Sequence, residues 1–400
     1  MAGRSIDRSY TISTTAFVAT YMPHPCGIAT YTYDLATAAF PRQIVAVQPP
    51  DGPTTYPAEV RHRIRRDVLE DYTSIAGALN DGVVDVVSLQ HDPSIYGGPD
   101  GDYVLALAQT LTLPLVTTLH VVPRTPTPGQ RRVITELALA SAATVALSSG
   151  AAALLARTYG VDTGRIEVVP HGVPHLPLVD PDTIKPRLDL VGKRILLSFG
   201  LLAPGKGYEA AIAAMPAIAA ADPTVLYVIL GATAPDRVAA DGEAYRESLV
   251  ELVAKLGMGA HIRFVDRFMG RVELATWVEA ADVFLAPYLD LDRVTSGTLS
   301  YAMGAGKAVV ATPFAYAKER LMRGRGMLVA PGSPELLSEA VLKLLGDRKL
   351  RDGYGAKAYE ATRDQVWSAT GAAYGRIFAR VARPSVRPSP PVRRLAPAGR

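Results

Sequence analysis

The sequence predicts an α/β protein made of two Rossmann-like, doubly wound domains that face a central cleft. Two observations support this class. Short apolar runs alternate with helix-like stretches along most of the 400 residues, and the alternation is interrupted once, near residues 172–192. Continuous apolar strands separated by helices are typical of parallel sheets covered on both faces. Right-handed crossovers then give doubly wound sheets, in which ligands bind beyond the carboxyl ends of the strands.

Twelve short apolar runs are predicted to be strands because polar or turn-forming residues bound them. The six in the first half of the chain are 13–19, 43–47, 83–90, 113–120, 143–148 and 166–170. The six in the second half are 194–200, 224–231, 261–266, 282–288, 307–312 and 326–330.

The interruption marks a domain boundary. Residues 171–194 are rich in Pro, Asp and charged side chains, which is typical of an interdomain linker. We therefore expect a first domain at 1–172, a hinge near 172–192 and a second domain at 193–363. The segment 383–400 is rich in Pro and Arg and is expected to be a disordered tail.

The composition indicates a soluble globular protein, with 48% hydrophobic and 20% charged residues. Cys26 is the only cysteine, so no internal disulfide is expected, and a reducing, cytoplasmic location is favoured. The first residues lack the apolar core of a secretory signal. The apolar stretch 137–156 contains Ser, Thr and Gly and is interpreted as helix–strand–helix rather than as a membrane span.

The net charge of +4 comes from the tail, where five arginines and no acid lie between residues 383 and 400; without them the formal charge is −1. A nucleic-acid partner is therefore not supported. The segment 61–72 has five basic residues, His62 among them, and three acidic ones, and is interpreted as a solvated helix face. Membrane association is left open, and the sequence does not indicate an oligomeric state.

The loop that follows the strand at 194–200 has features that favour an anion. Gly200, Gly205 and Gly207 keep the loop backbone accessible, and Lys206 stands at the start of the next helix. A phosphate there would meet both the ammonium and free backbone N–H groups. The loop matches neither the GxxxxGK[ST] nor the GxGxxG pattern. Lys206 as an ordinary solvated lysine remains an equal alternative.

A second helix start lies in "DLDRVTSGTLS", residues 290–300. Thr295, Ser296 and Gly297 are placed either to cap this helix or to form a second anion cradle. Two cradles in one domain would suit a diphosphate. The tripeptide "DLD" at 290–292 matches a common DxD pattern, and the chance interpretation is favoured over a metal site.

The stretch "PHPCGIATYTYDL" predicts a third such site, in the first domain. Gly27 permits close backbone approach, and the helix expected from Ile28 would direct its positive end toward the cleft. Nothing near Cys26 indicates a thiolate nucleophile. Of the histidines that end predicted strands, His120 is favoured as functional because the carboxyl end of a parallel strand faces the cleft. No His or Cys spacing indicates a metal site.

Taken together in their order, these motifs resemble the retaining, nucleotide-sugar-dependent glycosyltransferases of family four, which have the GT-B fold. The similarity covers most of residues 12–380. It is carried by "PHPCGIATYTYDLA", "LQHDPSIYGGPDGDY", "VTTLH", "YGVDTGRIEVVPHGV", "FGLLAPGKGYEAAI" and "SGTLSYAMGAGKAVVATPFAYA".

The resemblance implies transfer of a hexose, such as mannose or glucose, from a nucleotide sugar to a hydroxyl-bearing acceptor, without a metal or other cofactor. The second domain would bind the donor and the first the acceptor. The helix at 364–382 would cross back onto the first domain, with Trp367 as an anchor. The implied residues are Gly27 at the donor phosphate and sugar, His120 beside the transferred sugar, Lys206 at the diphosphate, and the Thr295–Thr298 backbone as its cradle.

Three positions depart from the family pattern. Members usually carry two glutamates eight positions apart, one contacting the transferred sugar and one the nucleotide ribose; here these positions hold Arg293 and Tyr301. Leu201 replaces an arginine that normally helps to bind phosphate. We interpret the departures as a subgroup trait. Our hypothesis is that Arg293 supplies the missing charge and that Tyr301 lies at the ribose.

Two other function classes fit the same architecture. A nucleotide-sugar epimerase-like enzyme would need additional acid–base carboxylates, and the sequence does not indicate a pair. A non-catalytic sugar-nucleotide binding protein would be consistent with the missing glutamates. A nicotinamide-dependent dehydrogenase is disfavoured because no glycine fingerprint with a following acidic residue appears after any strand.

Overall fold

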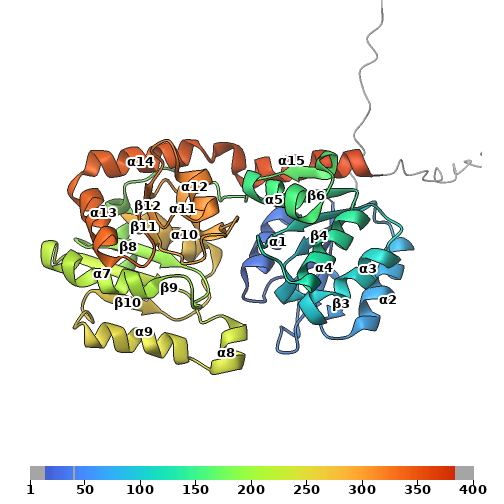
Figure 1. Ribbon diagram of the computed structural model, residues 1–400, viewed down its shortest axis with the longest axis horizontal. Coiled ribbons are helices and arrows are strands. Elements are labelled where there is room, and N and C mark those ends of the chain that lie inside the picture. The colour runs from blue at the N-terminus through green and yellow to red at the C-terminus, as the bar shows by residue number, and fades with distance from the viewer. Residues whose placement is uncertain (1–13, 39–40, 383–400) are drawn as a thin grey trace, which may run out of the picture.

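The computed structural model describes residues 14–38 and 41–382, which form two α/β lobes. Figure 1 shows the first domain in blue to green and the second in green to orange. The predicted fold class is confirmed, because each lobe contains one parallel sheet with helices on both faces.

The first sheet has seven parallel strands in the order β3-β2-β1-β4-β5-β6-β7. The order reverses beside β1, so the carboxyl ends of β1 and β4 flank the position where such sheets bind ligands. The strands are β1 Thr15–Ala19, β2 Arg42–Gln48, β3 Val60–Arg65, β4 Val86–His91, β5 Leu115–Leu119, β6 Ala143–Ala146 and β7 Ile166–Val168.

The helices of the first domain have identifiable starts. Thr127 and Gln130 form a capping box at α4, and the Ser148 hydroxyl accepts the Ala151 N–H at α5. The five helices are α1 Gly27–Ala38, α2 Leu69–Asn80, α3 Tyr103–Thr110, α4 Pro128–Ala140 and α5 Ser149–Tyr159, with 3₁₀ turns η1 Pro93–Ile95, η2 Pro99–Gly101 and η3 Thr163–Arg165.

The second sheet has six parallel strands in the order β10-β9-β8-β11-β12-β13, which again reverses beside its first strand, β8. The buried strands are almost entirely apolar, as expected for a sheet covered on both faces. The strands are β8 Arg194–Phe199, β9 Val225–Leu230, β10 Ile262–Val265, β11 Val283–Ala286, β12 Ala308–Ala311 and β13 Met327–Leu328.

Helices of the second half cover this sheet and then return to the first domain. They are α6 Pro181–Ile184, α7 Tyr208–Ala221, α8 Pro235–Asp241, α9 Ala244–Lys255, α10 Arg271–Ala280, α11 Gly297–Gly304, α12 Ala315–Leu321, α13 Pro334–Gly346, α14 Arg348–Glu360 and α15 Trp367–Val381, with 3₁₀ turns η4 Lys185–Leu188 and η5 Arg363–Gln365.

All twelve predicted runs overlap an observed strand, but one strand of the described residues was missed. The interpretation of 61–72 as a solvated helix face is wrong, because Val60–Arg65 forms β3 and α2 begins only at Leu69. β3 is the edge strand beside β2, where one side of the strand is free and charged side chains are tolerated. Arg61, Arg63 and Arg65 alternate outward around the buried Ile64, so the period is two, not 3.6.

No helix among the described residues is both long and apolar enough to cross a membrane. The stretch 137–156 contains the end of α4, the four-residue β6 and the start of α5, as predicted. The predicted tail at 383–400 lies outside the described residues.

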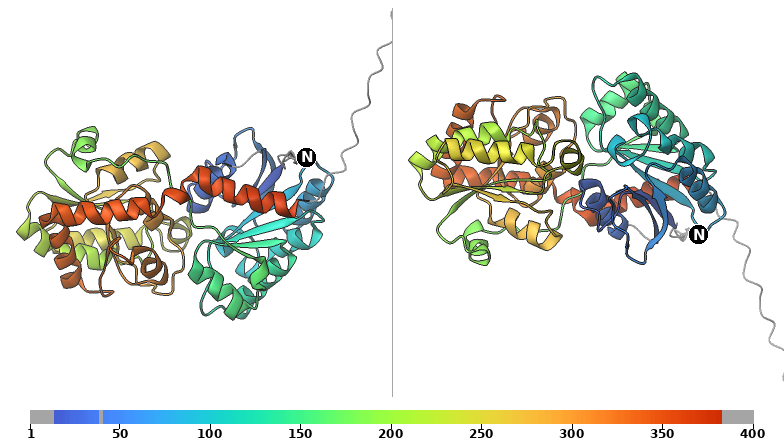
Figure 2. Two further views of the ribbon diagram at one scale, coloured as in Figure 1. Left: turned by 90° about the horizontal axis from the view of Figure 1, so that it is seen from above. Right: turned by 90° about the horizontal axis from the view of Figure 1, so that it is seen from below.

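The linker between the sheets is held at both ends. Val173 pairs with Val366 just before α15, and Lys185 is buried with its ammonium 2.8 Å from Asp282 in the second domain. Figure 2 shows α14 over the second domain and α15 continuing across the first. The chain therefore passes between the domains twice, along two neighbouring segments.

Helix α15 packs on the first domain through buried aromatic side chains. The Tyr374 hydroxyl lies 3.0 Å from the Tyr31 hydroxyl of α1 and 2.8 Å from Thr118 Oγ1 of β5. Phe378 meets Phe17 of β1 edge to face, with ring centroids 6.1 Å apart. The last helix thus completes the core of the first domain from the far end of the chain.

Replacing Phe378 with Ala should lower the free energy of unfolding by about 3–5 kcal/mol, because a buried ring is removed and the cavity is only partly refilled. Urea unfolding followed by tryptophan fluorescence and circular dichroism measures the change. Arg376→Ala, on the exposed side of the same helix, should change the value by less than ~0.5 kcal/mol. Equal effects of the two substitutions would contradict this packing.

Candidate active site

The start of α11 is in direct contact with the first domain. Ser296 caps the helix, its hydroxyl accepting the Leu299 N–H at 3.3 Å. The Thr295 hydroxyl donates to the His120 carbonyl at 2.7 Å, so it bonds across the domain boundary. A Cβ on Gly297 would lie 2.8 Å from His171 Nε2. A glycine is therefore required for this close approach.

Lys206 lies beside this helix start. Gly200, at φ +115°, lies between Lys206 and the start of α11. A Cβ at this position would lie 3.2 Å from Thr298 Cγ2 and 3.5 Å from Lys206 Nζ. Lys206 Nζ donates to the Leu201 carbonyl, and no carboxylate of the described residues lies within 4.0 Å of it. Burial, and then the neighbouring Arg293 guanidinium, lower the pKa of Lys206 to about 8. The ammonium is thus a partly buried cation without an ion pair among the described residues.

Arg293 contributes a second cation to this region. Its guanidinium lies over the Tyr288 ring at 5.3 Å, and Nε is 3.7 Å from the Asp290 carboxylate. The side chain is 40% exposed, so the Asp290 pair compensates its charge only weakly. The Tyr288 hydroxyl in turn lies 2.6 Å from Thr298 Oγ1 at the start of α11. Arg293, Thr298 and Lys206 therefore surround one positively charged region.

His120 stands at the carboxyl end of β5 as a neutral imidazole. Burial, followed by the nearby His171 and His91, lowers its pKa to about 3. Its Nε2 is 3.0 Å from Gln90 Oε1; with Gln90 in this orientation, Nε2 carries the proton and donates to the amide oxygen. The Gln90 amide N–H₂ donates to Ser88 Oγ at 3.1 Å. The imidazole of His120 is thereby held by a chain of two buried polar side chains.

The start of α1, in the first domain, is the third of the three helix starts that the sequence predicted for the site. Cys26 Sγ accepts the Ala29 N–H at 3.2 Å and lies 3.1 Å from Thr20 Oγ1, so the thiol acts as the helix cap. Burial raises the pKa of the Cys26 thiol, which favours a capping thiol over a thiolate nucleophile. No atom lies within 4 Å of where a Cβ of Gly27 would be. The first turn of α1 therefore has open space beside it.

Tyr31, one turn further along α1, links these parts. Its ring meets His120 at 4.6 Å, His171 at 5.0 Å and Trp367 at 5.1 Å, each edge to face. Trp367 thus occupies the anchoring position predicted for it, where a Cβ on Gly172 would lie 2.4 Å from the indole. The helix starts of α1 and α11 are joined through this aromatic cluster.

The structure groups most of the predicted site residues. His120, Lys206, Arg293 and the Thr295–Thr298 turn lie around the start of α11, and Gly27 begins α1, the helix whose Tyr31 contacts His120. Tyr301 is separate from them. It is 8% exposed, and its ring meets Phe199 edge to face at 6.0 Å in the core of the second domain. Burial and the nearby Asp34 raise its pKa to about 12, so its hydroxyl stays protonated.

Sequence reasoning missed Gln90 and the part played by His171. Gln90 is fully buried at the end of β4 and orients His120. A glutamine inside the apolar run "VVDVVSLQH" was the available signal, since a buried amide needs partners. His171 is the first residue of the predicted linker; its Nδ1 donates to the Gly172 carbonyl at 2.7 Å, and its ring lies against Gly297.

The described residues contain no group of three or more His, Cys, Asp or Glu side chains arranged to hold a metal ion. The two carboxylates of the "DLD" tripeptide face arginines instead. Asp290 lies near Arg293, and Asp292 pairs with Arg124 of the first domain at 3.4 Å.

Two family models match the chain in succession. The model described as Glycosyltransferase Family 4 matches residues 25–175, and the model described as Glycosyl transferases group 1 matches residues 180–361. Every strand of the two sheets except β1, the start of α1 and the start of α11 fall within the matched residues.

Curated relatives match over about half of this chain. A phosphatidyl-myo-inositol mannosyltransferase of Mycolicibacterium smegmatis is 32% identical over 179 residues, 44% of this chain and 42% of the relative. A D-inositol 3-phosphate glycosyltransferase of Corynebacterium efficiens is 29% identical over 223 residues, 54% of this chain and 51% of the relative. The chain thus spans about half the length of these relatives.

Solved structures match over nearly the whole chain. Anabaena HepE in complex with UDP and glucose has a TM-score of 0.73 at 16% identity, covering 92% of this chain and all of that one. Sucrose-phosphate synthase from Thermosynechococcus elongatus has a TM-score of 0.73 at 17% identity, covering 92% and 98%. At these identities the likeness establishes the shared GT-B architecture.

Proposed function

Because the chain belongs to the group 1 glycosyltransferases, we propose that it transfers a hexose from a nucleotide-sugar donor to a hydroxyl-bearing acceptor, with retention of the anomeric configuration. The observation that carries the proposal is the partly buried Lys206 ammonium, without an ion pair among the described residues, beside Arg293 and the start of α11. Two cations next to a helix N-terminus favour a group with more than one negative charge, such as a diphosphate.

In the proposed reaction, negative charge develops on the diphosphate as the sugar–phosphate bond breaks. Lys206 and the backbone N–H groups at 295–298 would stabilise that charge electrostatically, in a site from which the two domains exclude water. Arg293 would supply the charge that Leu201 lacks. We expect these groups to stabilise the leaving diphosphate without a resident metal.

His120 would position the transferred sugar rather than act as a base. Its neutral, hydrogen-bonded imidazole has a pKa of about 3, far from the value near working pH that suits a general base. No carboxylate stands out among the grouped residues as a nucleophile. The leaving phosphate would therefore accept the acceptor's proton on the same face of the sugar, which accounts for the proposed retention.

The comparisons suggest which substrates to try first. HepE was solved with UDP, with UDP and glucose, and with UDP-glucose, which supports a uridine nucleotide as one donor candidate. The curated relatives are named for mannosyl transfer to phosphatidyl-myo-inositol and for glycosyl transfer to D-inositol 3-phosphate. Inositol, inositol phosphate and phosphatidylinositol are therefore the first acceptors to test.

The first experiment is thermal unfolding with UDP, GDP, ADP and dTDP. We expect one nucleotide to raise the midpoint by several degrees, because ligand at about a hundred times its Kd adds roughly 2.7 kcal/mol. Sugar donors with that base are then tested for transfer, and NMR of the product gives the anomeric configuration. Binding without transfer or donor hydrolysis would favour the non-catalytic alternative, and an inverted product would contradict retention.

Arg293→Ala should weaken binding of the selected nucleoside diphosphate about tenfold, because a charge-assisted contact to phosphate is lost at a half-exposed position. Isothermal titration calorimetry measures the change. Asp290→Asn is the matched control: it removes the carboxylate near Arg293 and should leave binding equal or tighter. Unchanged affinity in Arg293→Ala would show that this residue does not replace the missing arginine.

The affinity for the nucleoside diphosphate should also fall as the pH rises through 8. Lys206, whose pKa is lowered to about 8, loses its charge above that pH. Between pH 7 and pH 9 the Kd should rise about tenfold if only the ammonium form binds. Lys206→Arg stays charged over this range and should show a flat profile. The same pH dependence in both proteins would assign the titration to another group.

A further inference from the structure

A pocket with charged lining residues lies at the opposite end of the second sheet from Lys206 and Arg293. It has a volume of about 220 Å³ and is bounded by the linker at 178–181, the residues before β11 and β12, and the first turn of α14. Lys206 and Arg293 follow β8 and β11, whereas this pocket adjoins the amino ends of β11 and β12. It is therefore separate from the proposed donor site.

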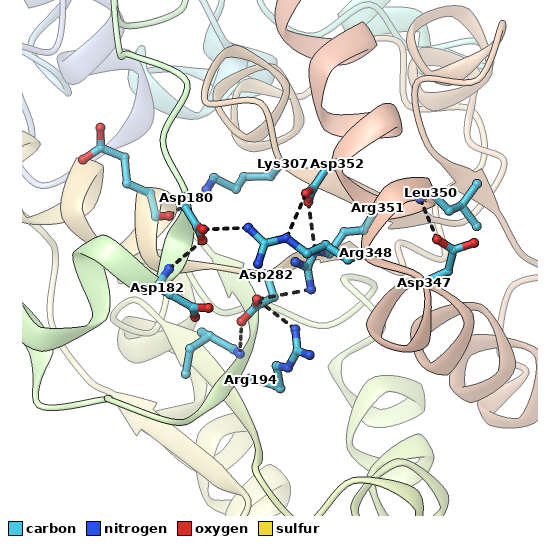
Figure 3. A network of polar contacts seen from close by, with 12 residues as sticks. Asp180, Asp182, Arg194, Asp282, Lys307, Asp347, Arg348, Leu350, Arg351 and Asp352 are labelled. Carbon is cyan, nitrogen blue, oxygen red and sulfur yellow. Dashed lines mark hydrogen bonds and ion pairs between the residues drawn. The ribbon is translucent and has the colours of Figure 1, made fainter.

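Charged side chains make up half of the residues that line the pocket, and Figure 3 shows them as a network of polar contacts. Six of the lining residues are ionisable: Asp180, Asp282, Lys307, Arg348, Arg351 and Asp352. They come from four segments that are distant in sequence, namely the linker, the turn before β11, the turn before β12 and helix α14. The cluster therefore exists only in the folded second domain.

Asp282 is the buried acid at the centre of this cluster. Its Oδ2 accepts the Ile195 N–H at 2.7 Å and lies 2.8 Å from Lys185 Nζ. Its Oδ1 lies 3.5 Å from Arg351 and 3.8 Å from Arg194. One carboxylate thus faces three cations. The acids that pair with the outer parts of the cluster, Asp180, Asp182 and Asp352, are all at least one-third exposed.

Two buried cations on the pocket wall have unused hydrogen-bonding capacity. Lys307 is 3% exposed, and its Nζ donates to the Glu279 carbonyl at 2.6 Å. No carboxylate of the described residues lies within 4.0 Å of that ammonium. Arg351 is 5% exposed; its Nε pairs with Asp352 at 3.3 Å, and its Nη1 lies 3.5 Å from Asp282 Oδ1 without forming a hydrogen bond. Buried cations are costly unless an anion compensates them.

Arg348 completes the set at the pocket mouth. It pairs with Asp180 at 2.7 Å and with Asp352 at 3.3 Å, and it is 61% exposed, so it can exchange these partners for a ligand. Two guanidinium groups and an ammonium facing one space suit the several oxygens of a phosphate. The flanking carboxylates of Asp180 and Asp352 can accept hydrogen bonds from hydroxyl groups.

We propose that this pocket binds a small phosphate monoester, with Lys307, Arg348 and Arg351 on the phosphate and Asp180 and Asp352 on the hydroxyl groups of the attached polyol or sugar. The volume of 220 Å³ is below the range of about 300–1,000 Å³ typical of drug-sized ligands, which favours a small molecule. The proposal does not depend on the glycosyltransferase activity, because the pocket shares no residue with the donor site.

The test is calorimetric titration of the full chain with inorganic phosphate, glycerol 3-phosphate, glucose 6-phosphate and, as the uncharged comparison, glucose. We expect the two monoesters to bind more tightly than phosphate, and glucose not to bind. Arg348→Gln and Lys307→Met should each weaken monoester binding about tenfold, since each removes a charge-assisted contact. Arg348 is exposed, so its substitution preserves folding even if Lys307→Met does not.

Two control variants separate this site from its surroundings. Arg194→Gln removes a cation that faces Asp282 but does not line the pocket, and should leave monoester binding unchanged. Lys206→Met disables the proposed donor site and should also leave it unchanged. Binding lost in Lys206→Met but kept in Arg348→Gln would place the phosphate in the donor site and overturn the proposal. Absence of binding at 10 mM of any of the three phosphates, roughly the weak limit of a specific site, would identify the cluster as a purely structural ion network.

Discussion

The arrangement of the candidate site depends on the packing around the buried ring of Tyr31. This side chain of α1 contacts His120 of the first sheet, His171 of the linker and Trp367 of the last helix, while its hydroxyl reaches Tyr374. Edge-to-face contacts of this kind are directional, so they fix the mutual orientation of the four segments as well as holding them together. The start of α11 is then positioned against the same group through Thr295 and Gly297.

Charged side chains of the second domain form two groups, one at each end of its sheet. Beyond the carboxyl ends of the strands, Lys206 and Arg293 are cations with little compensation. At the amino ends, Asp282 and its surrounding cations form a denser network in which Lys307 and Arg351 remain incompletely satisfied. A glycine with a positive φ lies beside each group: Gly200 beside Lys206, and Gly306, at φ +69°, beside Lys307. Parallel strands make both ends accessible, because every crossover helix leaves a loop at each end.

The departures from the family pattern have a consistent physical interpretation. The position of the first expected glutamate holds Arg293, which adds positive charge where Leu201 has removed it. The position of the second holds Tyr301, a residue of α11 whose ring packs against Phe199. The positive charge beside the start of α11 therefore comes from a different loop than in the family pattern, and the placement of Tyr301 at the ribose stays a prediction.

The sequence by itself determined all but one of the described strands, the two-domain organisation and the helix starts of the candidate site, because apolar runs, capping residues and glycines act over a few neighbouring positions. It also indicated His120, Lys206 and Thr295–Thr298, since strand ends and helix starts are visible locally. It did not determine the edge strand β3, whose charged alternation mimics a solvated helix until its place beside β2 is known. Only the tertiary structure decided that Gln90 orients His120, that His171 lies against Gly297, and that Lys307 and Arg351 meet beside Asp282. Those contacts join residues far apart in the chain, and a local pattern carries no information about which distant side chain will satisfy a buried polar group.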